Sequence, residues 1–312
     1  MHLVIPFASA LAEEVRRVLP TLALPNLARL LARLEAGARD EADAWTLTPP
    51  HERALAAAWG WHGRDGVLPF AARAAAVDGL GVGAHAWGLV TPAHWLVGRD
   101  HVTMLDPAAL ALDADESRTA FEALRGLFED DGYAWHWGAP LRWYVTHADL
   151  ADLPCASPDR VIGRNVDFWI DAGSRADARA ARLRRLQSEV QLLLHAHPLN
   201  EAREARGQAV VNSFWLSGCG VAQPIDAAAV RLEDALRPPL LAGDVRGWAA
   251  AWAALDAGAL GELLAAVESG AQSTLTLCGE RSAQRYESRS RSLWQRLRAG
   301  RGPQPQAVLE AL

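Results

Sequence analysis

The chain has 312 residues, of which 50% are hydrophobic, and a formal net charge of −6 at pH 7. This composition provides a core for one large domain or two of ordinary size. It excludes a disordered chain and a chain drawn to nucleic acid by its overall charge. All 31 basic residues are arginine. The absence of lysine excludes lysine Schiff bases and lysine general bases, but arginine remains suited to bidentate recognition of anions.

The spacing of the cysteines and the length of the apolar stretches indicate the cellular compartment of the protein. Cys155, Cys219 and Cys278 are widely spaced and form no C-x-x-C pair, which argues against a disulfide framework or a thiolate zinc site. The first seven residues lack the basic segment of a secretory signal, and acidic residues interrupt the most apolar stretch, residues 247–267. We therefore expect a soluble cytoplasmic protein without membrane attachment.

The first elements are typical of an α/β domain. Leu3–Ile5 predicts a short buried strand. Pro25 then begins a helix with its leucines on one face, which we expect to close near Gly37 before a polar loop at residues 40–43. A Pro-Pro pair stops the next stretch and places His51 at the start of another helix.

From about residue 80 the pattern changes to short apolar runs separated by Gly, Pro and Asp, which predicts antiparallel strands of a second lobe. The expected strands are residues 87–90, 94–97, 102–105, 133–137 and 141–145, the last two as a hairpin. A helix capped by Asp113 or Asp115 is expected to run to Phe128. Residues 161–169 fit either a helix or a strand.

The last third of the chain is richer in helix. A leucine stripe between residues 183 and 194 predicts an amphipathic helix, and a strand is expected at 213–216. A last buried strand is expected at 274–277. The segment 281–301 carries seven arginines against one glutamate, which predicts a docked helix with a solvated basic face.

The segment from residue 197 to residue 220 carries the most informative motif, H-P-x-N-x-x-R-x-x-x-G-x-x-x-x-N-x-x-x-x-x-G-x-G. It resembles the substrate-binding segment of the archaeal-type cofactor-independent phosphoglycerate mutases, metal-dependent enzymes of the alkaline-phosphatase superfamily. Residues 48–61 resemble the run of that family that carries the nucleophilic serine, with His51 at the place of the serine. Pro25-Asn26-Leu27, Asp78-Gly79-Leu80 and Leu141-Arg142-Trp143 resemble further segments in family order over the first 220 residues.

This resemblance implies an α/β fold: a reduced alkaline-phosphatase-like core over residues 1–79 and 186–312, with an inserted α+β substrate-type lobe over 80–185. The family reaction needs two divalent metals held by Asp and His beside the serine. Here Phe7-Ala8-Ser9 follows the first strand and Cys278-Gly279-Glu280 follows the last, although Asp244 and Asp256 are available acids. We therefore expect no metal and no catalytic residue, with manganese or zinc only if the chain is an active enzyme.

The resemblance implies that this chain keeps the residues for anion recognition. These are Asn200, Arg203, Asn212, Arg142 and Arg206. Arginine forks and asparagine amides suit a phosphate or a carboxylate. The same residue types also make ion pairs on helix surfaces and complete turns, so both interpretations remain open. As a pair, His195 and His197 could bind a metal but lack an evident third ligand.

The resemblance implies a non-catalytic protein with a regulatory or anionic-metabolite-binding role, similar to the bacterial RpfE-type regulatory proteins. Its expected partners are a phosphorylated or carboxylate small molecule or another protein, with no membrane and no nucleic acid. One alternative is an active mutase or phosphotransferase with relocated catalytic residues, with His51 as the phosphoryl acceptor. The other is a protein that binds nucleic acid or a partner through its arginine-rich tail.

Overall fold

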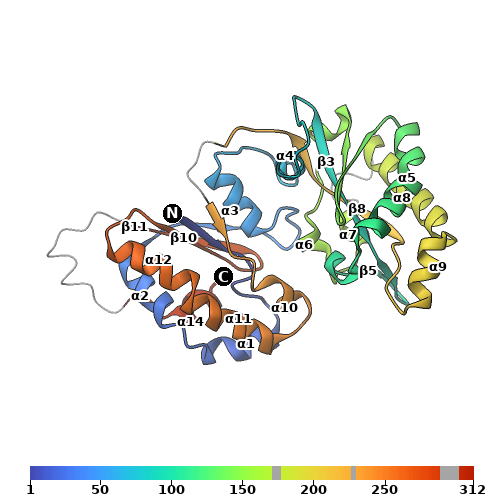
Figure 1. Ribbon diagram of the computed structural model, residues 1–312. Helices are drawn as coiled ribbons and strands as arrows, with labels where there is room; N and C mark the ends of the chain where they lie inside the picture. The colour runs from blue at the N-terminus through green and yellow to red at the C-terminus, as the bar shows by residue number, and fades with distance from the viewer. Residues whose placement is uncertain (171–176, 226–229, 289–301) are drawn as a thin grey trace. The chain divides into compact units, whose positions relative to one another are not determined.

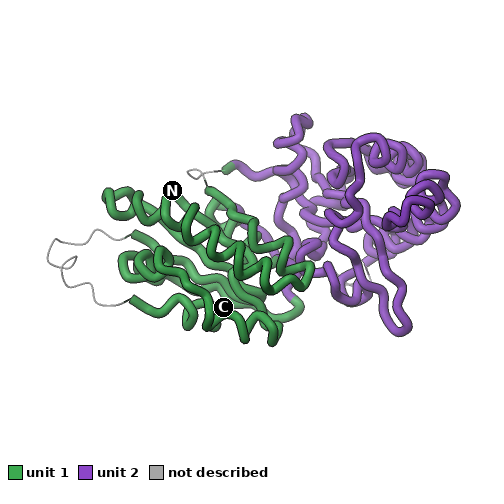
Figure 2. The backbone as a smooth tube through the Cα atoms, turned by 60° about the horizontal axis from the view of Figure 1, so that its bottom comes forward, with its two compact units in different colours: residues 1–45, 49–60, 225–312 green, residues 46–48, 61–224 purple. Residues whose placement is uncertain are grey.

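The computed structural model describes residues 1–170, 177–225, 230–288 and 302–312, which divide into two compact units (Figure 2). Unit 1 comprises Met1–Trp45, Pro49–Gly60 and Ile225–Leu312, and unit 2 comprises Thr46–Thr48 and Trp61–Pro224. The boundaries predicted at residues 80 and 185 both lie inside unit 2. The α/β fold class is confirmed by the mixture of sheets and helices (Figure 1).

Unit 1 is built on a five-stranded mixed sheet in the order β2-β11-β10-β1-β9. Its strands are β1 (His2–Ile5), β2 (Leu34–Glu41), β9 (Val230–Leu232), β10 (Thr274–Cys278) and β11 (Ser282–Ser288). The central strand β1 pairs in parallel with β10 and β9, whereas β11 pairs antiparallel with β10 on one side and with β2 on the other. Leu3, Val4 and Ile5 of β1 are all buried, as expected for a central strand with helices on both faces.

Helices cover both faces of this sheet (Figure 1). They are α1 (Glu13–Val18), η1 (Leu19–Thr21), α2 (Pro25–Arg33), α3 (Pro50–Ala58), α10 (Arg237–Leu241), α11 (Val245–Ala257), α12 (Ala259–Glu268) and α14 (Pro305–Glu310). Leu3 and Ile5 of β1 pack in one cluster with the apolar faces of α2, α11 and α12. Helix α3 lies on the opposite face, against β1, β10 and β11. The alternation of side chains along β1 thus supplies both layers.

The segment Val245–Glu268 is the one described stretch with the length and apolar composition of a membrane-spanning helix. In unit 1 it is divided at Gly258 into α11 and α12. Trp248, Trp252 and Leu260 of this segment are fully buried in the core. Packing in the core of unit 1 therefore accounts for the apolar residues on the buried side of this segment.

Two predictions for unit 1 were wrong. The helix expected to reach Gly37 ends at Arg33, and Gly37 with Asp40 and Glu41, the first half of the expected polar loop, belongs to strand β2. The strand at 274–277 is not the last, because residues 282–288 form β11 between β10 and β2. Both errors concern antiparallel pairing between distant segments, which local periodicity does not reveal. The rest of the predicted basic helix, residues 289–301, lies outside the described residues.

Unit 2 contains a four-stranded antiparallel sheet in the order β6-β7-β3-β8 and a separate ribbon of β4 and β5. The strands are β3 (Ala86–Ala93), β4 (Trp95–Val97), β5 (Val102–Met104), β6 (Ala134–Ala139), β7 (Arg142–Thr146) and β8 (Ser213–Val221). All six were expected from the sequence. Strand β8 pairs with β3, so residues 186–221 lie in unit 2. The sequence prediction placed them with residues 1–79 in the core.

The helices of unit 2 are α4 (Phe70–Val77), η2 (Pro107–Leu110), α5 (Ala114–Asp130), η3 (Ala148–Ala151), α6 (Pro158–Val161), α7 (Asp167–Ile170), α8 (Ala178–His195) and α9 (Pro198–Ala205). Asp113 caps α5 as predicted, because its carboxylate accepts hydrogen bonds from the amides of Asp115 and Glu116. The ambiguous residues 161–169 contribute to the short helices α6 and α7. Between α5 and the sheet, Phe128 stacks on Trp135 with ring centroids 4.2 Å apart.

The histidine at the start of β1 predicts a pH dependence of stability. His2 contacts Thr276 Oγ1 at 2.8 Å. Burial, followed by the positive charges of Arg285 and the N-terminus, lowers the pKa of His2 from 6.5 to about 4. The folded state therefore favours the neutral ring, so its contribution is present above pH 6.5 and is lost as the pH falls toward 4.

We expect the wild type to lose more stability than His2→Gln between pH 7 and pH 5, because glutamine cannot take up the proton but can still donate to Thr276. Urea unfolding of both proteins at each pH measures this difference. Identical pH slopes would contradict the assignment.

Candidate functional site

The motif at residues 197–220 forms helix α9, the turn after it and strand β8. His197 caps α9, since its Nδ1 accepts a hydrogen bond from the Leu199 amide at 3.2 Å. Proline at the first helical position suits this start. The cap places Asn200 and Arg203 on the buried face of α9, whereas Arg206 lies at the exposed end. The first part of the motif therefore forms a capped helix whose buried face carries Asn200 and Arg203.

Arg203 is fully buried and its donors are used inside unit 2. Its Nε donates to the carbonyl of Ala209 at 2.8 Å, and its Nη2 donates to the carbonyl of Leu110. Its Nη1 pairs with Glu116 on α5. Arg206 pairs with the other oxygen of the same carboxylate, but its side chain is 50% exposed. These contacts join α9 to α5 and do not present Arg203 to a ligand.

The side chains of the two asparagines of the motif also form hydrogen bonds with the backbone. Asn200 donates from Nδ2 to the carbonyls of Leu194 and Val211 at 2.8 and 2.7 Å, and its Oδ1 accepts from the Val211 amide at 3.0 Å. Asn212 forms a reciprocal pair with the amide and carbonyl of Trp95, at 2.7 and 3.0 Å. Asn200 is buried with both of its amide hydrogens donated, which stabilises the turn after α9. Asn212 is only partly buried and donates from Nδ2 to the Trp95 carbonyl alone.

Arg142 lies on β7 in a different polar group. Its Nε and Nη2 donate to the two oxygens of Asp78, at 2.9 and 2.7 Å, and the hydroxyl of Tyr144 donates to the same carboxylate at 2.6 Å. The hydrogen bond from Arg142 lowers the pKa of Asp78. Burial and the hydrogen bond to Asp78 raise the pKa of Tyr144. The Arg142 side chain is nevertheless 47% exposed, so the carboxylate fixes a guanidinium that solvent still reaches.

The structure does not bring the five predicted residues together as one set. Arg203 and Arg206 share Glu116, whereas Arg142 binds Asp78 and Tyr144. Sequence analysis missed Tyr144 and Glu116 as partners. A signal existed for Tyr144, because it follows Arg142 by two residues and therefore lies on the same face of a strand.

His51 lies in the first turn of α3 in unit 1, as expected from the Pro-Pro pair. Only 8% of its surface is exposed, and its ring lies 5.4 Å from the ring of Phe7. Phe7 follows β1 and has a φ of 55°, a left-handed conformation that is unusual for an aromatic residue. Trp248 donates to the Phe7 carbonyl at 3.0 Å, which helps to hold this turn.

The acids named as available for metal binding act as helix caps in unit 1. Asp244 accepts from the Gly247 amide at 2.8 Å at the start of α11. Asp256 accepts from the amides of Asn26 and Leu27, at 3.0 and 2.8 Å, at the start of α2. Within residues 1–170, 177–225, 230–288 and 302–312, no three His, Cys, Asp or Glu side chains gather where they could hold a metal ion.

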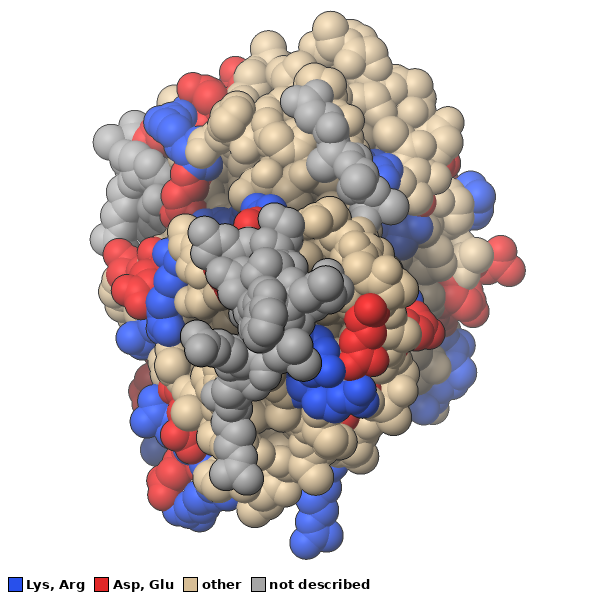
Figure 3. Space-filling model, turned by 90° about the vertical axis from the view of Figure 1, so that its left-hand side faces the viewer, with Lys and Arg blue, Asp and Glu red and all other residues tan. Residues whose placement is uncertain are grey.

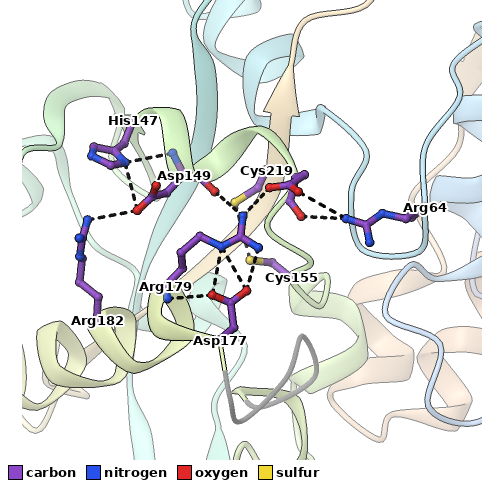
Figure 4. A network of polar contacts seen from close by, with 9 residues as sticks. Arg64, His147, Asp149, Cys155, Asp177, Arg179, Arg182 and Cys219 are labelled. Atoms are coloured by element: carbon purple, nitrogen blue, oxygen red, sulfur yellow. Dashed lines mark hydrogen bonds and ion pairs between the residues drawn. The ribbon is translucent and has the colours of Figure 1, made fainter.

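A further polar network joins the start of α8 to the loop after η3 in unit 2 (Figure 4). Arg179 binds Asp177 at 2.7 Å and also pairs with Asp152, and its hydrogen bond lowers the pKa of Asp177. Arg182 binds Asp149 at 3.2 Å. Cys155 and Cys219 lie beside this network. Neither the network nor the proximity of the two cysteines was expected from the sequence.

Basic and acidic side chains lie next to one another on the face of the molecule in Figure 3, and neither sign dominates it. Ion pairs of unit 1 illustrate this mixing: Arg285 binds Glu287, and Arg231 binds Glu262, each at 2.6 Å. The nucleic-acid alternative depended on the arginine-rich tail. Most of its arginines fall within residues 289–301, outside the described chain, so that alternative stays a prediction.

No family model matches the chain, and no curated protein matches it. Among solved structures, it is similar to a cofactor-independent phosphoglycerate mutase from Thermoplasma acidophilum, with 14% identity and a TM-score of 0.35 over 100% of this chain and 98% of that chain. It is also similar to the PH0037 protein from Pyrococcus horikoshii, with 13% identity and a TM-score of 0.46 over 92% of this chain and 87% of that chain.

Proposed function

We propose that the chain is a non-catalytic relative of the cofactor-independent phosphoglycerate mutases, with a regulatory or anionic-metabolite-binding role. The observation that carries this proposal is the burial of His51, at the place of the nucleophile, against Phe7. A phosphoryl acceptor must be reached in line with the bond that breaks. A histidine with 8% of its surface exposed does not offer that access.

The residues after the parallel strands β1 and β10 support the same proposal. Ligands of open α/β sheets bind at the carboxyl ends of such strands. Here the Ala8 amide donates to the Cys278 carbonyl at 2.8 Å, and Glu280 accepts from the Leu11 amide at 3.1 Å. Gly279 lies so close to Leu312 that an added Cβ would meet it at 2.7 Å. This edge is occupied by packing and backbone hydrogen bonds.

The ligand-binding part of the proposal depends on Arg142. Asp78 holds one edge of its guanidinium through Nε and Nη2, and 47% of the Arg142 side chain stays exposed. A half-exposed arginine fixed in one orientation loses little freedom when it binds a phosphate or carboxylate oxygen. Arg203, Asn200 and Asn212 then support the fold of unit 2 and do not contact the ligand.

The catalytic part is tested by incubating the full chain with manganese and 3-phosphoglycerate and measuring 2-phosphoglycerate by coupling to enolase. We expect no product above the rate without protein, because no accessible acceptor is present at residue 51. Sustained turnover would overturn the non-catalytic assignment. Loss of that turnover in His51→Ala would instead establish the phosphotransferase alternative.

The binding part is tested by thermal unfolding with 3-phosphoglycerate. A ligand at a hundredfold over its dissociation constant stabilises by about 2.7 kcal/mol. We expect this stabilisation in the wild type and its loss in Arg142→Gln. The matched control is Arg125→Gln, which removes a half-exposed arginine paired with Glu122 and Glu129 and should retain the effect. No stabilisation of the wild type, or equal loss in both variants, would overturn the role of Arg142.

A further inference from the structure

Two cysteine sulfurs meet in unit 2, although 64 positions separate them in the sequence. Cys219 lies on β8, and Cys155 lies in the loop between η3 and α6. Their Sγ atoms are 3.7 Å apart (Figure 4). A disulfide has a sulfur–sulfur distance of about 2.05 Å, so the two atoms need to approach by roughly 1.7 Å.

The backbone holds the loop of Cys155 beside β8. The Cys155 amide donates to the Gly66 carbonyl at 3.0 Å. The indole of Trp215, on β8, donates to the carbonyl of Ala156 at 2.8 Å. One hydrogen bond therefore ties the residue next to Cys155 to the strand that carries Cys219. These hydrogen bonds keep the two sulfurs close together in the folded protein.

The two thiols differ in access. Cys219 is fully buried, whereas Cys155 is partly exposed and lines a pocket together with Pro154, Trp215 and Leu216. The hydrogen bond with Cys155, followed by burial, raises the pKa of Cys219 well above its usual range. Reactivity of a thiol follows its thiolate fraction and its exposure. Cys155 is therefore the sulfur that a small reagent reaches first.

We propose that Cys155 and Cys219 are a modification site, a dithiol that hydrogen peroxide or a small organic hydroperoxide oxidises reversibly to a disulfide. The Cys155 thiolate attacks one peroxide oxygen, the O–O bond breaks, and the leaving oxygen departs as water or an alcohol after taking a proton. Cys219 then attacks the sulfur of the resulting sulfenic acid, and its thiol proton leaves with the hydroxyl group as water. The peroxide accepts two electrons in all, one from each sulfur.

This proposal is independent of the proposed function, because neither cysteine belongs to the groups around Arg142 or His51. The third cysteine, Cys278, lies in β10 of unit 1 and is fully buried. Burial raises the pKa of its thiol, so it should stay reduced. It therefore serves as an internal control in the same chain.

The test treats the reduced full chain with a small excess of hydrogen peroxide, blocks the remaining thiols by alkylation and maps the peptides by mass spectrometry. We expect a 155–219 linked peptide, loss of two hydrogens from the intact mass, and an alkylated Cys278. Dithiothreitol should restore the starting mass. A chain unfolded in urea before oxidation should lose this preference, because the folded structure brings the sulfurs together.

Three serine variants separate the steps. Cys219→Ser should stop at the sulfenic acid, which dimedone traps on Cys155, and Cys155→Ser should give neither the adduct nor the disulfide. Cys278→Ser should form the disulfide as the wild type does. The proposal is overturned if the folded wild type yields no 155–219 peptide, if Cys278 enters the linkage, or if dimedone labels residue 219 in place of 155.

Discussion

Arg203→Ala is expected to lower the free energy of unfolding by about 3–5 kcal/mol, the cost of removing one partner of a buried ion pair. Arg203 is fully buried, and its loss leaves the carbonyls of Ala209 and Leu110 and one oxygen of Glu116 without their donor. A cavity the size of an arginine side chain adds to the loss. Urea unfolding followed by tryptophan fluorescence measures the change.

The matched control is Arg206→Ala, because Arg206 pairs with the same carboxylate from an exposed position. Exposed ion pairs contribute about 0–1 kcal/mol, so this loss should be several times smaller. Equal losses would show that burial of Arg203 does not determine its contribution. If Arg203 instead binds an anion, its replacement would abolish stabilisation by 3-phosphoglycerate and leave the unfolding free energy without ligand unchanged.

Elements that depend on neighbouring residues were predictable from the sequence, whereas elements that depend on pairing between distant segments were not. Helix α8 and the cap at Asp113 follow from leucine spacing and from one carboxylate placed before a helical run, and both were confirmed. Strand β2 was missed because its sequence is largely charged and alanine-rich, and it becomes a strand only by pairing with β11, more than two hundred residues later. Register between distant strands leaves little trace in a local window.

The same distinction applies to the site. The spacing from His197 to Asn212 predicted anion recognition by Asn200, Arg203 and Asn212, but it could not identify their partners in the fold. Guanidinium and amide donors suit a phosphate oxygen and a backbone carbonyl equally well. The structure gives Arg203 and Asn200 carbonyl partners, which favours the structural interpretation for these two residues. The meeting of Cys155 with Cys219 was likewise unpredictable, because it depends on a loop folding back onto β8.

The second large effect is expected for Asp256→Ala in unit 1. Asp256 is 3% exposed, and its two carboxylate oxygens accept from the amides of Asn26 and Leu27 in the first turn of α2. A carboxylate at a helix N-terminus also interacts favourably with the helix dipole. The buried Leu27 amide costs about 1–3 kcal/mol without its acceptor and the partly buried Asn26 amide costs less, so we expect a loss of about 2–4 kcal/mol in urea unfolding.

Asp244→Ala is the control, because Asp244 caps α11 through one amide at an exposed position and should cost only about 0.5–1 kcal/mol. Asp256→Asn keeps one carbonyl oxygen as an acceptor and should fall between the two. The Asn26 side chain also donates to the Asp256 carbonyl at 2.8 Å, so Asn26→Ala should weaken the same contact from the other side. If Asp256→Ala costs no more than Asp244→Ala, the contact between α2 and the end of α11 does not stabilise unit 1. The Pro25-Asn26-Leu27 segment would then need an explanation other than this structural one.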